Sequence, residues 1–376
     1  MATYAGLNPQ SVLRDALLDP TQDISSQGLA YSRIFGVPAL KGEGSTLVTG
    51  KAIDLTGDPG TLHGKLLVRA RRNILGAAAG KVAQAIGASR DVSNRFDRSE
   101  VAFSMKQFAG RAEIGMEYVT HGYLPSAEEE YLLVQQSMDA VHIKAEKYVS
   151  SFFTTKAAEG SVGGRAGGGW TELDWQDASV GGTDLDQSTD AMDVLHSIIQ
   201  DARLRGGSPV NAIYMGRRVA EKLAREASVL GRIIVKSGGA ADGSVSAFQG
   251  QRVAPLSFVE AVLSDHFEIP VENIVIGSAT HNDESDTAQD GTNGYIWPSD
   301  RLWVGSMSDV SLAVGGGRSP RVISGAGAGC MLIGKLDTAV GPEAGNMPQK
   351  FEAISEMFMD CAALDTSKGT LVHNLG

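Results

Sequence analysis

The sequence contains only two cysteines, Cys330 and Cys361, and it has no long apolar run. Two cysteines exclude a disulfide framework or a zinc knuckle, so we expect a reducing compartment. No uncharged apolar stretch reaches the roughly 18 residues that a membrane helix requires. The first residues also lack the basic and apolar regions of a signal peptide. The sequence therefore predicts a protein without membrane contact.

Positive charge is scarce as well. The chain has 33 Lys and Arg side chains and 44 Asp and Glu side chains, which gives a net charge of −11. This balance argues against a protein whose main task is to hold nucleic acid by its phosphates. The chain has 376 residues, 42% of them hydrophobic, which allows a large core and more than one domain. Its 46 glycines favour loops and β-structure over a helical bundle.

Much of the positive charge lies in residues 64–115, which contain ten basic and four acidic side chains. Such a segment binds an acidic surface of a second copy, faces solvent, or binds nucleic acid. We favour the first, because an apolar stretch from Ile74 to Ile86 dilutes the charge and no aromatic residues interleave with it. The residues predicted to make inter-subunit contacts are Lys65, Arg69, Arg71, Arg72, Arg95 and Arg98.

A long amphipathic helix is predicted over residues 126–153. Ser126 and Glu129 have the spacing of a capping box. Apolar side chains then recur every three or four residues, which indicates one buried stripe: Val134, Met138, Val141, Ala145, Tyr148 and Phe152. Alternating residues before this helix, around 101–106 and 113–118, predict two half-buried strands.

A glycine-rich break at residues 160–170 separates this helix from a second region. That region predicts helices at 189–205, 217–226 and 257–267, the last with a capping box at Ser257 and Glu260. Strands are predicted at 211–215, 271–277, 294–297 and 302–305. Residues 350–360 fit both the two-residue period of a strand and the 3.6-residue period of a helix, and we favour a strand. Short helices and strands in this order indicate an α/β or α+β domain.

No catalytic or metal site can be assembled from the sequence. Gly44–Ala52 has the wrong spacing for a phosphate-binding loop, and Gly325–Gly329 lacks the rest of a dinucleotide fingerprint. No two histidines have metal-ligand spacing, so we expect each to lie at the surface or an interface. Both cysteines are expected to be buried apolar residues. The acidic run 281–290 is read as a solvated loop, with a weak divalent-cation site as the alternative.

The order of these segments resembles the major capsid proteins of tailed bacteriophages, which have the Hong Kong 97-like fold. Phe108–Val119 leads into the long helix, which resembles the family's spine helix. Leu173–Asp177 is similar to the family's Trp-x-Asp segment, and Ser208–Leu223 to its Pro-Asn block, with Val210 between proline and asparagine. The stretch from Ser257 to Trp303 resembles a helix, a Val-Gly strand and a tryptophan-led strand, with Pro298 where the family often has glycine.

The resemblance implies an α+β fold with five parts. They are an N-terminal arm (1–43), an extended β-hairpin loop or E-loop (44–115), a peripheral or P domain (116–185) with the spine helix at 126–153, an axial or A domain (186–317), and C-terminal strands that return to the P domain (318–376). The E-loop and the arm are expected to have little core of their own and to rest on neighbouring copies.

The resemblance also implies function. The chain is expected to be a structural protein, without enzymatic activity or cofactor, that assembles as pentamers and hexamers into an icosahedral shell. The shell encloses double-stranded DNA without sequence-specific binding, and it is assembled in the bacterial host cytoplasm. Expected partners are a portal protein, a separate scaffolding protein and a decoration protein. The scaffolding protein is expected to be separate because the segment before the spine helix is needed for arm and loop.

Two alternatives stay open. Encapsulins share the fold and enclose enzymes, although the arm and the inserted loop at 281–294 favour the viral form. A soluble α/β enzyme with an unrecognised site is the alternative from a different class.

Overall fold

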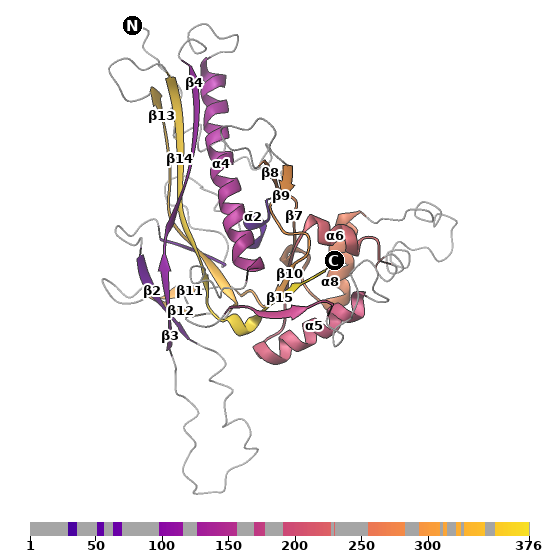
Figure 1. The fold of residues 1–376 in the computed structure, drawn as a ribbon. Coiled ribbons are helices and arrows are strands. Elements are labelled where there is room, and N and C mark those ends of the chain that lie inside the picture. Colours follow the sequence, from indigo (N-terminus) through magenta and orange to yellow (C-terminus); the bar gives the residue numbers. More distant parts are fainter. Residues whose placement is uncertain are drawn as a thin grey trace, which may run out of the picture.

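The computed structural model describes just over half of the chain, in fourteen segments (Figure 1). These are residues 29–35, 51–55, 63–69, 98–115, 126–155, 169–176, 191–226, 229, 255–282, 293–308, 311–313, 321–324, 327–342 and 350–375. Helices and strands are both abundant, which confirms the predicted α+β class.

One half of the molecule is a long sheet with one long helix along it (Figure 1). Its strands, in spatial order, are β1 (Ala52–Asp54), β13 (Gly329–Pro342), β14 (Lys350–Ala363) and β4 (Lys106–Gly115). Helix α4 (Ser126–Thr154) packs on β4 and β14 and is about 44 Å long at 1.5 Å per residue. The predicted apolar stripe of this helix is buried against the sheet, with Tyr148 partly buried.

The other half is a five-stranded sheet that is buried on both faces. Its strands are β5 (Thr171–Asp174), β15 (Gly369–His373), β10 (Leu302–Gly305), β6 (Ala212–Gly216) and β7 (Ile274–Gly277). One face packs on α5 (Ala191–Gly206), α6 (Arg217–Leu223) and α8 (Leu256–Phe267). The other face packs on the end of α4, where Phe153 contacts Tyr214 and Trp303 edge-on while these two rings stack on each other.

A third sheet, which we call the flap sheet, covers part of the long sheet on the side away from α4. It consists of β11 (Ser311–Ala313), β12 (Arg321–Ser324), β2 (His63–Arg69) and β3 (Arg98–Ser104). Only Met105 separates β3 from β4, so the chain passes from the flap sheet to the long sheet within one residue. Figure 1 shows this crossing at the lower end of β4.

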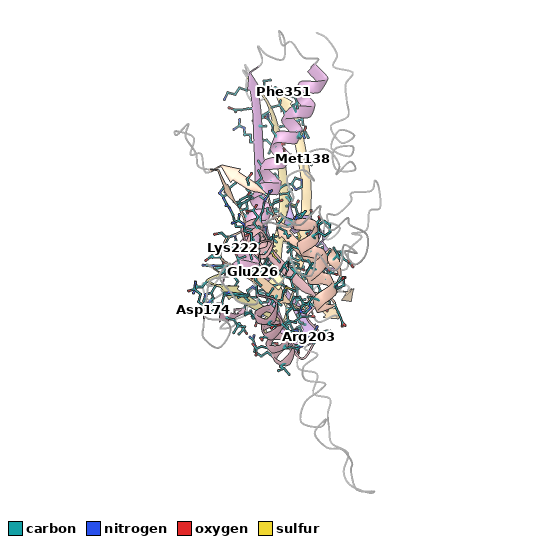
Figure 2. The ribbon with its side chains drawn as sticks, turned by 90° about the vertical axis from the view of Figure 1, so that its right-hand side faces the viewer. Met138, Asp174, Arg203, Lys222, Glu226 and Phe351 are labelled. Carbon is teal, nitrogen blue, oxygen red and sulfur yellow. The ribbon has the colours of Figure 1, made fainter. Side chains whose placement is uncertain are left out.

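The remaining elements are short. They are α2 (Ala30–Phe35), the β8–β9 hairpin (Thr280–Asn282 and Asn293–Tyr295), and the 3₁₀ turns η6 (Val271–Asn273) and η7 (Thr366–Lys368). In Figure 2, Met138 and Phe351 lie at the long-sheet end of the molecule, whereas Arg203, Lys222 and Glu226 lie around the five-stranded sheet.

Several predicted elements are confirmed and some details are wrong. The long helix, the strand at 350–360 and the strand at 302–305 are present. The prediction of a capping box at Ser257 is wrong, since α8 begins after Pro255 and has no side-chain cap. Residues 271–273 form a 3₁₀ turn before the strand, because Pro270 precedes them and Asn273 donates to its carbonyl. The capping side chains Ser126 and Glu129, and residues 116–118, lie outside the described part.

Candidate subunit contact surface

Three of the six basic residues predicted to make inter-subunit contacts lie on the paired strands β2 and β3. Lys65 and Arg69 lie on β2, and Arg98 lies on β3. Arg69 and Arg98 occupy directly opposite positions at the end of the hairpin. Arg71, Arg72 and Arg95 lie outside the described residues.

Lys65 already has a partner within its own chain. Its ammonium group donates to Glu100 Oε2 at 2.9 Å, and both side chains are more than half exposed. This hydrogen bond raises the pKa of Lys65 above its ordinary value. Because the pair faces water, it contributes little to folding, and Lys65 keeps its positive charge at neutral pH.

The described strands β2 and β3 of the segment 44–115 are buried against the long sheet of the same chain, whereas the expectation was support from a neighbouring copy. Leu66 and Val68 of β2 and Val101 and Phe103 of β3 are buried in one cluster with Cys330, Leu332, Ala362 and Leu364 of the long sheet. Sequence reasoning missed this because β2 pairs with β12, which lies far away along the chain. Residues 70–97 lie outside the described part.

A buried carboxylate fixes the point where the flap sheet meets the long sheet. Asp360 on β14 accepts hydrogen bonds from the Ser104 backbone N–H at 2.9 Å and the Tyr148 hydroxyl at 2.6 Å. The backbone pairing between β4 and β14 ends at Lys106. Because β3 turns away there, the Asp360 carboxylate takes the place of a backbone carbonyl as the acceptor for the Ser104 N–H. The Lys106 ammonium lies 4.3 Å from the centre of the Tyr148 ring. Asp360 therefore joins the flap, the spine helix and the C-terminal strand.

The outward face of the long sheet carries a ladder of ion pairs. Lys350 Nζ lies 2.6 Å from Glu113 Oε1, and Arg111 lies 3.4 Å from Glu113 and 2.6 Å from Glu352. Hydrogen bonding to Lys350 lowers the pKa of Glu113. β4, which carries Arg111 and Glu113, is an edge strand of this sheet, and charged side chains on an edge strand oppose pairing with other chains.

The amino-terminal helix α2 is held in a socket on α4. The Glu146 carboxylate accepts the backbone N–H groups of Ala30 at 3.0 Å and Tyr31 at 2.8 Å, and the indole N–H of Trp297 at 2.5 Å. The Tyr31 hydroxyl is hydrogen-bonded to His142 Nδ1, and the two rings stack at 5.9 Å. We call Glu146, His142 and Trp297 the α2 socket.

The sequence of α4 contains a pattern that indicates this socket. His142, Glu146, Val149 and Phe153 are spaced four, three and four residues apart, which is a second helical stripe beside the predicted one. All four side chains are buried, so His142 is not the surface or interface residue that was expected. The helix is buried on two sides, because α2 and the five-stranded sheet cover the second stripe.

The described residues show neither an activated cysteine nor a cluster of metal ligands. Cys330 and Cys361 are buried and unpaired, as predicted, and burial raises the pKa of Cys330 to about 12, which leaves no reactive thiolate. Within the described segments no three His, Cys, Asp or Glu side chains gather to hold a metal ion. None of the helices described is both long and apolar enough to cross a membrane. Most of the acidic run 281–290 lies outside these segments.

Comparison with solved structures identifies the fold. No protein-family model and no curated protein matches the sequence. A phage-related protein from Bordetella bronchiseptica is similar over 96% of this chain and 97% of its own, at 13% identity and a TM-score of 0.54. This likeness confirms the Hong Kong 97-like fold that the order of motifs implied.

Two further structures are similar at lower scores. They are a virus-like particle from Pyrococcus furiosus (9% identity, 98% and 100% of the two chains, TM-score 0.48) and the capsid of a native GTA particle (10%, 89% and 93%, 0.46). At these scores they add nothing to the fold assignment.

Proposed function

We propose that the chain is the major capsid subunit of a tailed bacteriophage and assembles into a closed icosahedral shell around double-stranded DNA. The observation that supports this function best is the shared fold with a phage-related protein along nearly the whole of both chains. The spine helix on a long sheet and the flap rooted beside it are the parts that the capsid resemblance implied. The charge of −11 suits a container, because its wall does not hold the genome tightly.

In this proposal the five parts keep the limits expected from the sequence. The arm is 1–43, the E-loop 44–115, the P domain 116–185, the A domain 186–317, and the C-terminal strands 318–376. Identical copies meet in pentamers and hexamers through contacts that close around rotation axes. A portal protein, a separate scaffolding protein and a decoration protein are the proposed partners. The proposed location is the virion, after assembly in the host cytoplasm, and the subunit has no enzymatic role.

Electron microscopy of the purified chain tests this function. We expect uniform hollow shells, if necessary after co-expression with the scaffolding protein. Shells that enclose a specific cargo protein would instead identify an encapsulin. Small discrete oligomers that turn over a substrate would identify an enzyme and contradict the proposal.

The charge of the β2–β3 hairpin gives a sharper test of the contact surface. Replacing Arg98→Glu places opposite charges across the hairpin from Arg69, so we expect the isolated subunit to unfold at slightly higher urea. The same change removes positive charge from the proposed contact, so we expect fewer shells by light scattering and microscopy. Arg98→Glu is therefore expected to raise the stability of the isolated subunit and to lower the yield of shells.

The matched control is Arg225→Glu, which changes the net charge equally at an exposed position outside the basic segment. This variant is expected to assemble as the unmodified chain does. Equal loss of assembly in both variants, or normal assembly of Arg98→Glu, would show that the hairpin charge does not act at a contact.

A further inference from the structure

Helix α2 depends on its socket for its conformation. It has six residues, and a helix this short is not stable alone in water. Ala30, Tyr31, Ile34 and Phe35 are all at most 3% exposed, so nearly every apolar side chain of the helix is buried against the body of the molecule. Releasing α2 therefore means unfolding it, and docking and helix formation are one equilibrium.

Three kinds of contact hold α2 in place. Glu146 accepts two of the backbone N–H groups at its amino end, which have no partner inside the helix. Arg33 pairs with Glu260 of α8 at 3.1 Å and donates to the Ile274 carbonyl at 3.3 Å. The Tyr31 hydroxyl contacts His142, which is only 7% exposed. Of these contacts, only the one with His142 involves a side chain whose ordinary titration lies near neutral pH.

We propose that α2 and its socket form an acid-sensitive latch, in which protonation of His142 releases residues 29–35 from the spine helix. The Tyr31 hydroxyl and His142 Nδ1 share a hydrogen bond in which a neutral imidazole can accept, whereas the protonated ring carries hydrogens on both nitrogens and can only donate, to the Tyr31 oxygen. Protonation also places a positive charge in a site walled by apolar side chains of α2 and α4, which is costly without a paired anion. Release lets the charged ring reach water.

The charged groups on the elements packed around His142 also bear on the pH effect. Tyr31 and Arg33 lie on α2, Glu146 lies one turn further along α4, and Glu260 of α8 is occupied by Arg33. On the long-sheet side of α4, Lys106 and Asp360 contact Tyr148. Lys51 donates to Asn273 beside η6 at 2.5 Å. Glu146 is thus the acidic group of the socket itself, and its two oxygens are occupied by three N–H donors.

Burial lowers the pKa of docked His142 from 6.5 to about 4. Between these values the released histidine binds a proton and the docked one does not, so docking weakens as pH falls. At pH 5 this difference amounts to a loss of docking of up to about 30-fold relative to neutral pH. Burial raises the pKa of Glu146, which acts in the opposite direction and reduces the loss. The full effect of His142 is reached below pH 4.

Hydrogen exchange of the full-length subunit between pH 7.5 and 4.5 tests the latch. We expect the protection of the amides in residues 29–35, corrected for the intrinsic exchange rate, to fall several-fold to about 70-fold by pH 4.5 while amides of β6 keep theirs. His142→Gln keeps an acceptor for Tyr31 but cannot become charged, so its α2 protection is expected not to fall with pH, and to rise where docked Glu146 binds a proton. Tyr31→Phe is expected to lower the protection at every pH and to retain the pH dependence, because the histidine stays buried.

The matched control is His196→Gln, which removes an exposed histidine of α5 and is expected to leave the wild-type profile unchanged. Constant protection of α2 down to pH 4.5 would overturn the latch. A His142→Gln variant that keeps the wild-type pH dependence would overturn it too. So would a joint loss of protection in α2 and β6, because acid would then unfold the whole subunit. None of these outcomes depends on whether the chain forms capsids.

Discussion

Replacing Gly110 with alanine is expected to destabilise the subunit more than adding one methyl group to a protein core usually does. Gly110 lies on β4 opposite Ser355 of β14, where α4 crosses the sheet most closely. A Cβ atom there would lie 2.0 Å from the Ser137 carbonyl oxygen of α4 and 3.1 Å from Ala140 Cβ. Overpacking a core costs roughly 1–3 kcal/mol. We expect the upper end of that range or more, because a helix backbone has to move.

The measurement is urea unfolding of the isolated subunit, followed by far-ultraviolet circular dichroism. The helix cannot retreat without breaking the Ser137–Ser355 hydroxyl contact of 2.7 Å and exposing Met138 and Val134. Gly341→Ala is the matched control, because Gly341 lies on β13 of the same sheet and its Cβ would meet nothing within 4 Å. A midpoint for Gly110→Ala equal to that of the control would contradict the close approach.

Glu146→Ala is expected to be the most destabilising change of a single side chain in the socket. The carboxylate is fully buried and accepts three N–H groups, from Ala30, Tyr31 and Trp297. Each buried donor left without an acceptor costs about 1–3 kcal/mol. The total will fall below the sum of three, because the two backbone donors reach water when α2 leaves its socket. The indole N–H of Trp297, which is 1% exposed, has no such escape.

Glu146→Gln should fall between the wild type and alanine. One amide oxygen still accepts from Ala30 and Trp297, whereas the amide nitrogen faces the Tyr31 N–H, so one of three hydrogen bonds becomes a clash of donors. Urea midpoints and the protection of residues 29–35 report this order. Glu100→Gln removes a carboxylate from the exposed pair with Lys65 and should have little effect. Equal midpoints for Glu146→Ala and Glu100→Gln would show that the socket does not hold α2.

Local patterns predicted the elements whose partners are close along the chain or whose burial is one-sided. The spine helix followed from its apolar period, and β14 followed from alternating Phe351, Ala353 and Met357. Element boundaries shifted where backbone geometry overrode the pattern, as at Pro255 and Pro270. The contact surface was predicted only as a charge excess, since composition does not say which basic residues face one another. The opposition of Arg69 and Arg98 is a matter of strand register.

The sequence by itself determined the class of the fold, the long helix and the uneven charge, because periodicity and composition are local properties of the chain. Only the tertiary structure decided that Glu146 and His142 hold a helix more than a hundred residues earlier, and that Asp360 joins the flap to the spine helix. These polar residues lie at buried positions, for which the sequence shows no partner nearby. Burial forces each to find one, and that partner is brought there by the fold rather than by proximity along the chain.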